Sequence, residues 1–542
     1  MLLINPDLHP DTQPEVFKPF TYASFPTAIG YLGGYLREKN GAAVELYDEQ
    51  IDYLSKDKLR SMLAALDAPK LVGLSVLTGT AKRAYEIARW IKEIDPETHI
   101  VMGGIHPTAV PDEPFLRTPV DIVVKGEGEA TLSEIYATLM SGEDDLSQIK
   151  GIAYRSGDQV NHNPARELLD VNDMPPFPYD MFADNIHHYP DFGTIISSRG
   201  CPFACSFCSQ RIISGRQMRY LSNERVVKKI ELLANTYGQT KIFFVDDVFT
   251  VNIKRTMALC DDIIAAGLHK KVRFICESRA REICANEERG NALLAKMREA
   301  NFVSIAYGVE TGSERLMETI NKSETVQHNI RAIEMTHAAG IAADASLILG
   351  LPSETKADRK MSVDVAKRIP LDGARFNIAV PYPGTAFYNT AEAEGRLNIG
   401  EDWVNCSNQH YLSNNDLPYT PVGSTANELV LAVFLANLRF TARPEVLFHM
   451  LFADSMAGGT VVSVHSKWYK SWKMWKAVFR LLLFLASRSA VILFKGLVLP
   501  LFGPKKPTAR TPNTNNEIGA PGERDQPAEE YLERVRKTDN CI

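Results

Sequence analysis

Cysteine is scarce in this sequence, with eight residues in 542. The N-terminus also lacks a charged leader with a long apolar stretch, because Pro6 stops the short apolar run from Met1 to Asn5. Secreted proteins stapled by disulfides need denser cysteines and an export signal. The sequence therefore argues against a disulfide framework, and we expect a cytoplasmic protein with reduced thiols.

A charge-free apolar run long enough to cross a bilayer is missing as well. Such a helix needs about 20 apolar residues, and the most apolar stretch carries Arg480, Arg488 and Lys495. The formal net charge of −6 argues against a general nucleic-acid binder. We therefore expect neither a transmembrane helix nor a nucleic-acid partner.

Acidic residues are absent from Ser455 to Asn516, a stretch that carries ten Lys or Arg. Trp468, Trp472 and Trp475 fall there among lysines, a combination typical of a membrane interface. At about 100° per residue, basic and apolar side chains take opposite sides of a helix. We therefore predict a basic amphipathic helix over 467–502, drawn to an anionic membrane surface.

A helix packed on the protein with a solvated basic face, or a partner-docking helix, is the alternative for 467–502. After Gly503 the chain turns polar and rich in Pro, Asn and Glu. That composition predicts a disordered tail over 503–542.

Three of the cysteines, Cys201, Cys205 and Cys208, form a C-x3-C-x2-C pattern. Three thiolates can ligate three irons of a [4Fe-4S] cluster and leave the fourth iron open for a small molecule. A structural zinc site is the alternative, but it closes its shell with four ligands, commonly from two separated pairs. No second pair is present, so the spacing favours the cluster.

The cysteine spacing, Phe207 before the third cysteine and Arg199-Gly200 before the first resemble the radical S-adenosylmethionine (SAM) superfamily. The resemblance implies that the open iron chelates SAM and that one electron from the cluster cleaves it to a 5′-deoxyadenosyl radical. That radical abstracts hydrogen from an unactivated carbon. A reducing partner such as flavodoxin or ferredoxin is implied too.

Short apolar runs alternate with amphipathic helical patterns over residues 1–155. This alternation predicts a doubly wound parallel sheet, which binds ligands at the carboxyl ends of its strands. The expected strands are 2–4, 44–47, 71–76, 100–102 and 122–124.

Ser75 and Leu77 after the third of these strands, and Gly103, Gly104 and His106 after the fourth, lie where a ligand would bind. Ser75-x-Leu77 followed by Gly103-Gly104 resembles the elements with which cobalamin-binding domains receive the nucleotide tail. The resemblance implies cobalamin as a cofactor.

The first strand departs from one cobalamin pattern. Domains that replace the lower axial base with histidine carry Asp-x-His-x-x-Gly, whereas Asp7 and His9 are followed by Pro10 and no glycine. We interpret His9 as a loop residue.

A proline-rich linker over 156–185 marks a domain boundary. Six strand and helix units follow over 186–400, a pattern typical of a partial (β/α)6 TIM-like barrel with its chemistry at the strand carboxyl ends. A helical subdomain is expected over 401–460. The predicted barrel strands are 194–197, 242–245, 273–276, 302–307, 345–349 and 374–380.

Polar residues end several of these strands, and SAM needs such partners for its amino acid end and its ribose. Asp246, Asp247, Arg279 and Glu310, with Phe207 of the cysteine motif, are the candidate SAM-binding residues. A helix cap or a surface ion pair is the alternative for each charged residue.

These features together predict a cobalamin-dependent radical SAM enzyme at the inner face of the membrane. The expected reaction is methylation of an unactivated carbon in a hydrophobic lipid, terpenoid or tetrapyrrole. One alternative is radical cyclisation or rearrangement without methyl transfer, as in the anaerobic magnesium-protoporphyrin monomethyl ester cyclase. The alternative of another class is a membrane-tethered sensor that binds cobalamin or a cluster.

Overall fold

A computed structural model describes residues 1–11, 23–406, 415–444, 486–487, 490–492 and 494. Of the predicted segment 461–502, only residues 486–487, 490–492 and 494 are described, and the tail 503–542 lies outside the described residues. None of the helices in the described ranges has the length and apolar composition needed to cross a bilayer.

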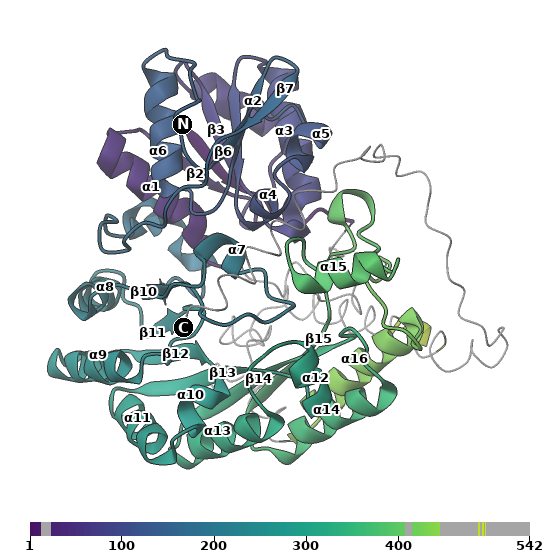
Figure 1. Cartoon of the computed structure of the whole chain (residues 1–542). Helices are drawn as coiled ribbons and strands as arrows, with labels where there is room; N and C mark the ends of the chain where they lie inside the picture. Colours follow the sequence, from purple (N-terminus) through teal and green to yellow (C-terminus); the bar gives the residue numbers. More distant parts are fainter. Residues whose placement is uncertain (12–22, 407–414, 445–485, 488–489, 493, 495–542) are drawn as a thin grey trace. The chain divides into compact units, whose positions relative to one another are not determined.

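The N-terminal part contains a seven-stranded sheet in the order β2-β1-β3-β4-β5-β6-β7 (Figure 1). The first five strands pair in parallel, and β6 and β7 add an antiparallel hairpin at one edge. The parallel sheet is therefore confirmed. The strands are β1 (Leu2–Asn5), β2 (Glu45–Asp48), β3 (Leu71–Ser75), β4 (His99–Gly103), β5 (Ile122–Val124), β6 (Ile152–Ser156) and β7 (Gln159–His162).

Helices cover both faces of this sheet. Ile29 of α1 (Thr27–Asn40) and Leu132 of α6 (Glu129–Met140) pack with Leu3 on one face. On the other face, α2 (Lys56–Ala65) and α3 (Ala81–Ile94) pack with the alternate strand residues, among them Leu2 and Ile4. Two short helices, α4 (Ile105–Ala109) and α5 (Glu113–Arg117), precede β5. The fold is doubly wound, as predicted.

The second part contains a six-stranded sheet in the order β15-β14-β13-β12-β11-β8, in which every pair is parallel. Among the described residues, β8 and β15 have one neighbour each, so the sheet is an open, partial barrel. The strands are β8 (Thr194–Ile195), β11 (Lys241–Phe244), β12 (Arg273–Ser278), β13 (Phe302–Glu310), β14 (Ala342–Leu349) and β15 (Gly373–Ile378).

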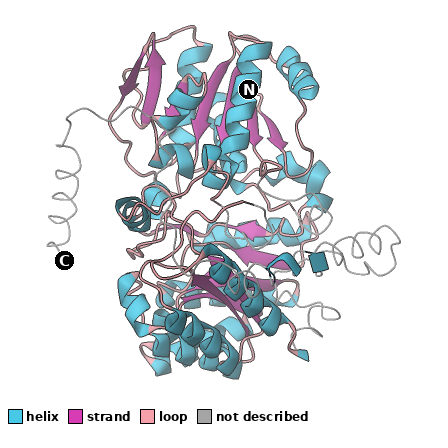
Figure 2. Cartoon of the chain, turned by 90° about the vertical axis from the view of Figure 1, so that its right-hand side faces the viewer, coloured by secondary structure: helices cyan, strands magenta, loops and turns pink. Residues whose placement is uncertain are grey.

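Helices follow these strands and cover one face of the sheet, as Figure 2 shows. Tyr307 of β13 faces this helical layer, since its Oη lies 2.6 Å from Thr336 Oγ1 on α13. The helices are α8 (Asn223–Asn235), α9 (Ile253–Ala265), α10 (Ala280–Cys284), α11 (Glu287–Glu299), α12 (Glu314–Thr319), α13 (Val326–Ala338), α14 (Lys356–Arg368), α15 (Ala386–Ala393) and α16 (Ala426–Thr441).

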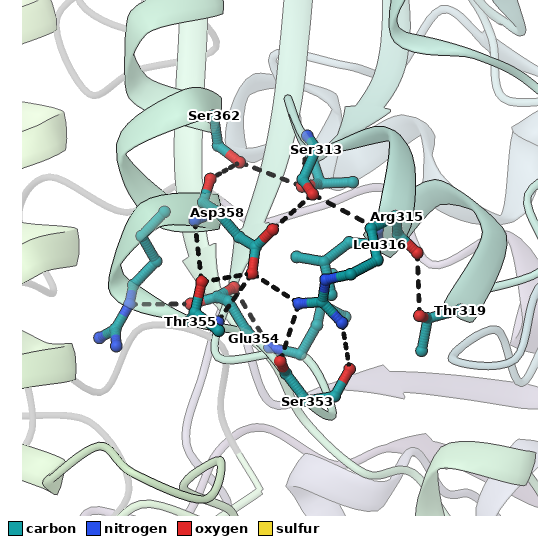
Figure 3. Close-up of polar contacts among 12 residues, drawn as sticks. Ser313, Arg315, Leu316, Thr319, Ser353, Glu354, Thr355, Asp358 and Ser362 are labelled. Atoms are coloured by element: carbon teal, nitrogen blue, oxygen red, sulfur yellow. Dashed lines mark hydrogen bonds and ion pairs between the residues drawn. The ribbon is translucent and has the colours of Figure 1, made fainter.

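A hydrogen-bond network centred on Asp358 of α14 ties the loops after β13 and β14 together (Figure 3). Its carboxylate accepts from Ser313 Oγ and Arg315 Nη2, each at 2.5 Å, and from Thr355 Oγ1 at 2.6 Å. Ser313 follows β13, whereas Thr355 caps α14 after β14. The network therefore fixes two neighbouring strand-end loops on the rim of the barrel.

Candidate functional site at the strand ends of two sheets

The cysteine motif lies in a loop closed by a short antiparallel ladder. This loop runs between β9 (Ser198–Arg199) and β10 (Arg219–Tyr220), which pair, and contains α7 (Arg211–Ser214). Gly200, with φ +96°, precedes Cys201, and a Cβ there would overlap the carbonyl oxygen of Gln217. Only glycine can therefore lead the chain into the first cysteine. We call residues 198–220 the cysteine loop.

Backbone contacts dock the cysteine loop on the barrel. The Ser206 amide donates to the Ile320 carbonyl at 2.9 Å, and Asn321 Nδ2 donates to the Ala204 carbonyl at 3.1 Å. The Phe387 amide of α15 donates to the Ser206 carbonyl at 2.9 Å. Phe207 is half-buried against the core. These contacts hold the motif beside the strand ends, where the sequence placed it.

Arg279, at the end of β12, reaches the central cysteine. Its Nη1 donates to Cys205 Sγ at 3.5 Å, and its Nη2 donates to the Lys322 carbonyl. The guanidinium stacks on Phe203, 3.7 Å from the ring centroid, and Nε lies 3.5 Å from Glu324. A cation at this position stabilises negative charge on the thiolate and on a cluster bound to it.

Glu310 pairs with a lysine that the sequence analysis missed. Lys322 Nζ lies 2.7 Å from Glu310 Oε1 and donates to the Gly308 carbonyl at 2.7 Å. Burial disfavours the ammonium, yet the carboxylates of Glu310 and Glu324 raise the pKa of Lys322. The carboxylate and the ammonium lie side by side near Arg279, and both can pair with a zwitterionic ligand.

The paired aspartates after β11 have different environments. Asp246 is fully buried, and its carboxylate accepts from the Ser197 amide at 2.6 Å, Ser197 Oγ at 2.5 Å and Ser198 Oγ at 2.7 Å. Asp247 lines a cavity instead, and burial, with the charges of Asp246 and Glu277, raises its pKa to about 7. The sequence grouped the two residues, whereas the structure places only Asp247 on a ligand-accessible surface.

The thiols of Cys201, Cys205 and Cys208 are all partly exposed. Burial raises the pKa of Cys201, and it raises that of Cys208 to about 11, so both are thiols without a metal. Coordination to iron removes such protons.

Across the described residues, no three His, Cys, Asp or Glu side chains are arranged around one metal ion. A four-iron cluster takes each thiolate on a different iron, so its cysteine ligands need not converge on one point. The donor set therefore fits a cluster.

A cavity of about 260 Å³ is lined by residues from both sheets. Ser75, Gly103 and Gly104 line it from the N-terminal sheet. The other wall comes from the cysteine loop and the end of β11, including Ser198, Arg199, Gln210, Ile213, Val245 and Asp247. Gly104, at φ +107°, has no room for a Cβ, which would lie 2.6 Å from the Val76 carbonyl oxygen.

A second cavity, of about 770 Å³, opens at the ends of β1, β2 and β3. Ser75 lines both cavities, and Leu77, 57% exposed, lines the second. The two cavities adjoin at the sheet's topological switch point, between β1 and β3, where open α/β sheets bind ligands. Together they give a large ligand room to contact bare backbone.

His106, predicted to bind cobalamin, does not line these cavities, and neither does His9. His106 is 0% exposed, with Nε2 3.0 Å from Tyr85 Oη and its ring 5.0 Å from that of Trp403. Burial lowers the pKa of His106 to about 3, so the imidazole is neutral. Because α4 begins at Ile105, the chain turns His106 away from the strand end into the core. His9 accepts a hydrogen bond from the Asp11 amide, which agrees with a loop role.

Sequence reasoning missed the charged residues that join the cysteine loop to the N-terminal part. Glu127 and Glu129 line the first cavity and pair with Arg199 and Arg219. The sequence does carry a signal for these carboxylates, because Gly126-Glu127-Gly128-Glu129 follows β5 after a single residue, Lys125. Lys322, by contrast, lies in a turn with no motif of its own.

Two family models match this chain. The model for the radical SAM superfamily matches residues 195–366, which include the three cysteines and Arg279. The model for the B12 binding domain matches residues 18–136, which include Ser75, Gly103 and Gly104.

Several curated proteins are similar over most of the chain. An uncharacterised methyltransferase of Pyrococcus horikoshii is 31% identical over 82% of this chain and 93% of its own length. The anaerobic magnesium-protoporphyrin IX monomethyl ester cyclase of Cereibacter sphaeroides is 29% identical over 67% of this chain and 60% of its own length.

Solved structures share the fold. The cobalamin-dependent SAM radical enzyme OxsB, with aqua-cobalamin and SAM bound, superposes with a TM-score of 0.58, at 24% identity over 68% of this chain and 52% of that chain. The radical SAM methyltransferase TsrM of Kitasatospora setae gives 0.59, at 18% identity over 85% and 93%.

Proposed function

This chain belongs to the cobalamin-dependent radical SAM enzymes, and from that membership we propose that it methylates an unactivated carbon of a hydrophobic substrate. A [4Fe-4S] cluster, SAM and cobalamin are its cofactors. The observation that carries the proposal is the cavity whose opposite walls are the strand ends of the B12-binding domain and the cysteine loop. A methyl donor and a radical source need such proximity.

The chain's own residues have separable roles in this proposal. Cys201, Cys205 and Cys208 would hold three irons of the cluster, and Arg279 supports the charge on Cys205. Glu310 and Lys322 offer a carboxylate and an ammonium to the amino acid end of SAM. When bound, the cluster with SAM supplies a hydrogen-abstracting radical, and cobalamin supplies a methyl group.

The apolar walls of the first cavity fit an apolar part of the substrate. Ile29, Leu74, Val101, Ile213 and Val245 line it, and Val245 is 43% exposed. The basic, tryptophan-containing stretch 467–502 supports the same substrate class by its composition alone. A lipid, terpenoid or tetrapyrrole, met at the inner face of a membrane, is the substrate that we propose. We propose flavodoxin or ferredoxin as the reductant.

Labelled SAM tests the reaction. Protein reconstituted with cluster and cobalamin is incubated anaerobically with a lipid extract, a reductant and SAM that carries a labelled methyl group. We expect the label in a product carbon. A product without label would instead support radical cyclisation, the activity in the name of the Cereibacter sphaeroides relative. Failure to cleave SAM at all would support a sensor.

Liposome flotation tests the membrane contact. The full chain should float with vesicles that contain anionic lipid, and a chain ending at Thr460 should not. Equal flotation of both chains would refute the proposed role of 467–502.

A further inference from the structure

We propose that Glu127, Glu129, Arg199 and Arg219 form a positioning network that fixes the cysteine loop against the first cavity, whose other wall is the strand ends that we assign to cobalamin. We call these four residues the ion-pair quartet. The inference rests on the proposed function, which places cobalamin at the strand ends that line the first cavity and the cluster in the cysteine loop. In this proposal the quartet is a ligand of neither cofactor. Its role is to fix the distance between the two cofactors.

The quartet joins two segments that lie far apart in the sequence. Arg199 Nη2 lies 2.6 Å from Glu129 Oε1, and Arg199 Nη1 lies 3.4 Å from Glu127 Oε1. Arg219 binds Glu127 through both terminal nitrogens, at 2.8 and 2.6 Å. The carboxylates therefore belong to the B12-binding domain, and the guanidinium groups belong to the cysteine loop.

The two arginines stand at the base of the cysteine loop. They face each other in the ladder of β9 with β10, where Arg199 pairs with Arg219. Arg199 is followed by Gly200 and Cys201, and the Cys201 amide donates to the Gly215 carbonyl at 3.3 Å. A shift of the ladder would thus move the first cluster ligand.

The four side chains of the quartet are largely buried, which restricts them to few alternative pairings. Side chains of Glu127 and Glu129 are each 6% exposed, and those of Arg199 and Arg219 are 13% and 8% exposed. Burial disfavours the Glu129 carboxylate, but Arg199 lowers its pKa below the usual value. Breaking one buried pair leaves an uncompensated charge, so the geometry has few alternatives.

The same side chains line the cavity from within. Glu127, Glu129 and Arg199 are all part of its wall, as is Tyr31 of α1. Arg199 stacks over Tyr31 at 5.0 Å, and Lys229 of α8 donates to Tyr31 Oη at 3.2 Å. A ligand in the cavity would press on the residues that hold the cysteine loop, which is the arrangement a positioning network requires.

Glu129→Gln is the informative variant, because it keeps the size of the side chain and removes its charge. Arg199 keeps its 3.4 Å contact with Glu127, which also binds Arg219, so the quartet of the variant carries one net positive charge that loosens the ladder. The matched control is Glu113→Gln. Glu113 accepts from Trp403 Nε1 at 2.7 Å, a contact between α5 and the segment after the barrel that lies away from both cavities.

The first measurement is hydrogen exchange of peptides from 198–220 in the full chain, without SAM or substrate. We expect at least tenfold faster exchange in Glu129→Gln and no change in Glu113→Gln. The second measurement uses protein loaded with cluster and cobalamin and then reduced. The magnetic coupling between the cluster and cob(II)alamin, seen by EPR, should spread over a range at least twice as wide in Glu129→Gln.

Unchanged exchange in 198–220 together with unchanged magnetic coupling would overturn the inference. If Glu129→Gln raises exchange throughout the chain, Arg199→Lys is tested in its place, because lysine keeps the positive charge but loses the two-pronged guanidinium contact. Faster exchange confined to 198–220 in Arg199→Lys then supports the network, and unchanged exchange there refutes it. Neither measurement needs a methylated product, so both results can be interpreted even if the proposed methyl transfer fails.

Discussion

Arg279 points its guanidinium at the middle cysteine of the motif, with Nη1 3.5 Å from Cys205 Sγ. The same side chain is clamped by the Lys322 carbonyl and by the ring of Phe203. A fixed positive charge beside a thiolate ligand favours the state of the cluster that carries one more electron.

Arg279→Gln should therefore lower the reduction potential of the cluster, by roughly 30–60 mV where 59 mV is a tenfold change for one electron. An anaerobic redox titration followed by EPR measures the potential. Arg281→Gln is the control, because Arg281 is exposed and bonds the Ser323 carbonyl instead. A higher or equal potential in Arg279→Gln would contradict the role assigned to the guanidinium.

Single replacements of Cys201, Cys205 or Cys208 by Ala should each prevent assembly of a stable four-iron cluster, since two thiolates hold a cluster poorly. Iron and sulfide analysis after anaerobic reconstitution measures this outcome. Cys284→Ala serves as the control, because that thiol packs in the core and should leave iron content at four per chain. Four irons retained in a motif variant would refute the assignment.

The sequence predicted the buried parallel strands because each is a short apolar run. All eleven predicted strands are present, and their ends lie within about three residues of the predicted bounds. It did not predict the β6–β7 hairpin, whose second strand has no buried residue and little apolar pattern. Because of that hairpin the sheet continues to His162, beyond the predicted domain end at residue 155.

Side-chain placement was less predictable than strand position. Asp246 and Asp247 are adjacent in sequence, but successive residues at a strand end face different surroundings, so only Asp247 lines the cavity. His106 follows Gly103 and Gly104 closely, yet the start of α4 turns it into the core. Lys322 meets Glu310 only because α12 folds back toward β13. Such contacts depend on tertiary packing, which a single sequence does not encode locally.

Gly104→Ala should weaken cobalamin binding by at least about tenfold, or about 1.4 kcal/mol. A Cβ there would displace the Val76 backbone beside the cavity, and the positive φ of +107° adds strain. Cobalamin retained after gel filtration is measured by absorbance. Gly142→Ala is the control, with a similar φ of +80° and open space around the Cβ, away from both cavities. Equal losses of bound cobalamin in both variants would mean that backbone strain, and not the lack of space beside the cavity, causes the effect.

Asp246→Asn should destabilise the barrel by roughly 2–4 kcal/mol, because an amide NH₂ would face donors in a buried site. Ser197 and Ser198 supply those donors. Urea unfolding measures the loss. Asp247→Asn is the matched comparison, and because Asp247 lines the cavity it should lower activity far more than stability. A stable Asp246→Asn protein would show that the buried carboxylate is not required.

Asp358 should make the barrel sensitive to acid. Burial alone would raise the pKa of its carboxyl, but hydrogen bonds from Ser313, Thr355 and Arg315 lower it well below the usual value (Figure 3). A carboxyl whose folded pKa lies below its unfolded pKa of about 3.9 stabilises the protein above that value. This stabilisation is lost as the pH falls from about 5 through the folded pKa.

Asp358→Asn should therefore cost roughly 1.5–3 kcal/mol at pH 7, the range for hydrogen bonds to a charged group. The cost should shrink as the pH falls toward 3, so the stability curves of the two proteins converge in acid. Urea midpoints at several pH values provide the measurement, with the exposed Asp184→Asn as control. Parallel curves would mean that the Asp358 carboxylate is not the group that titrates, because a neutral amide at 358 has no proton to gain.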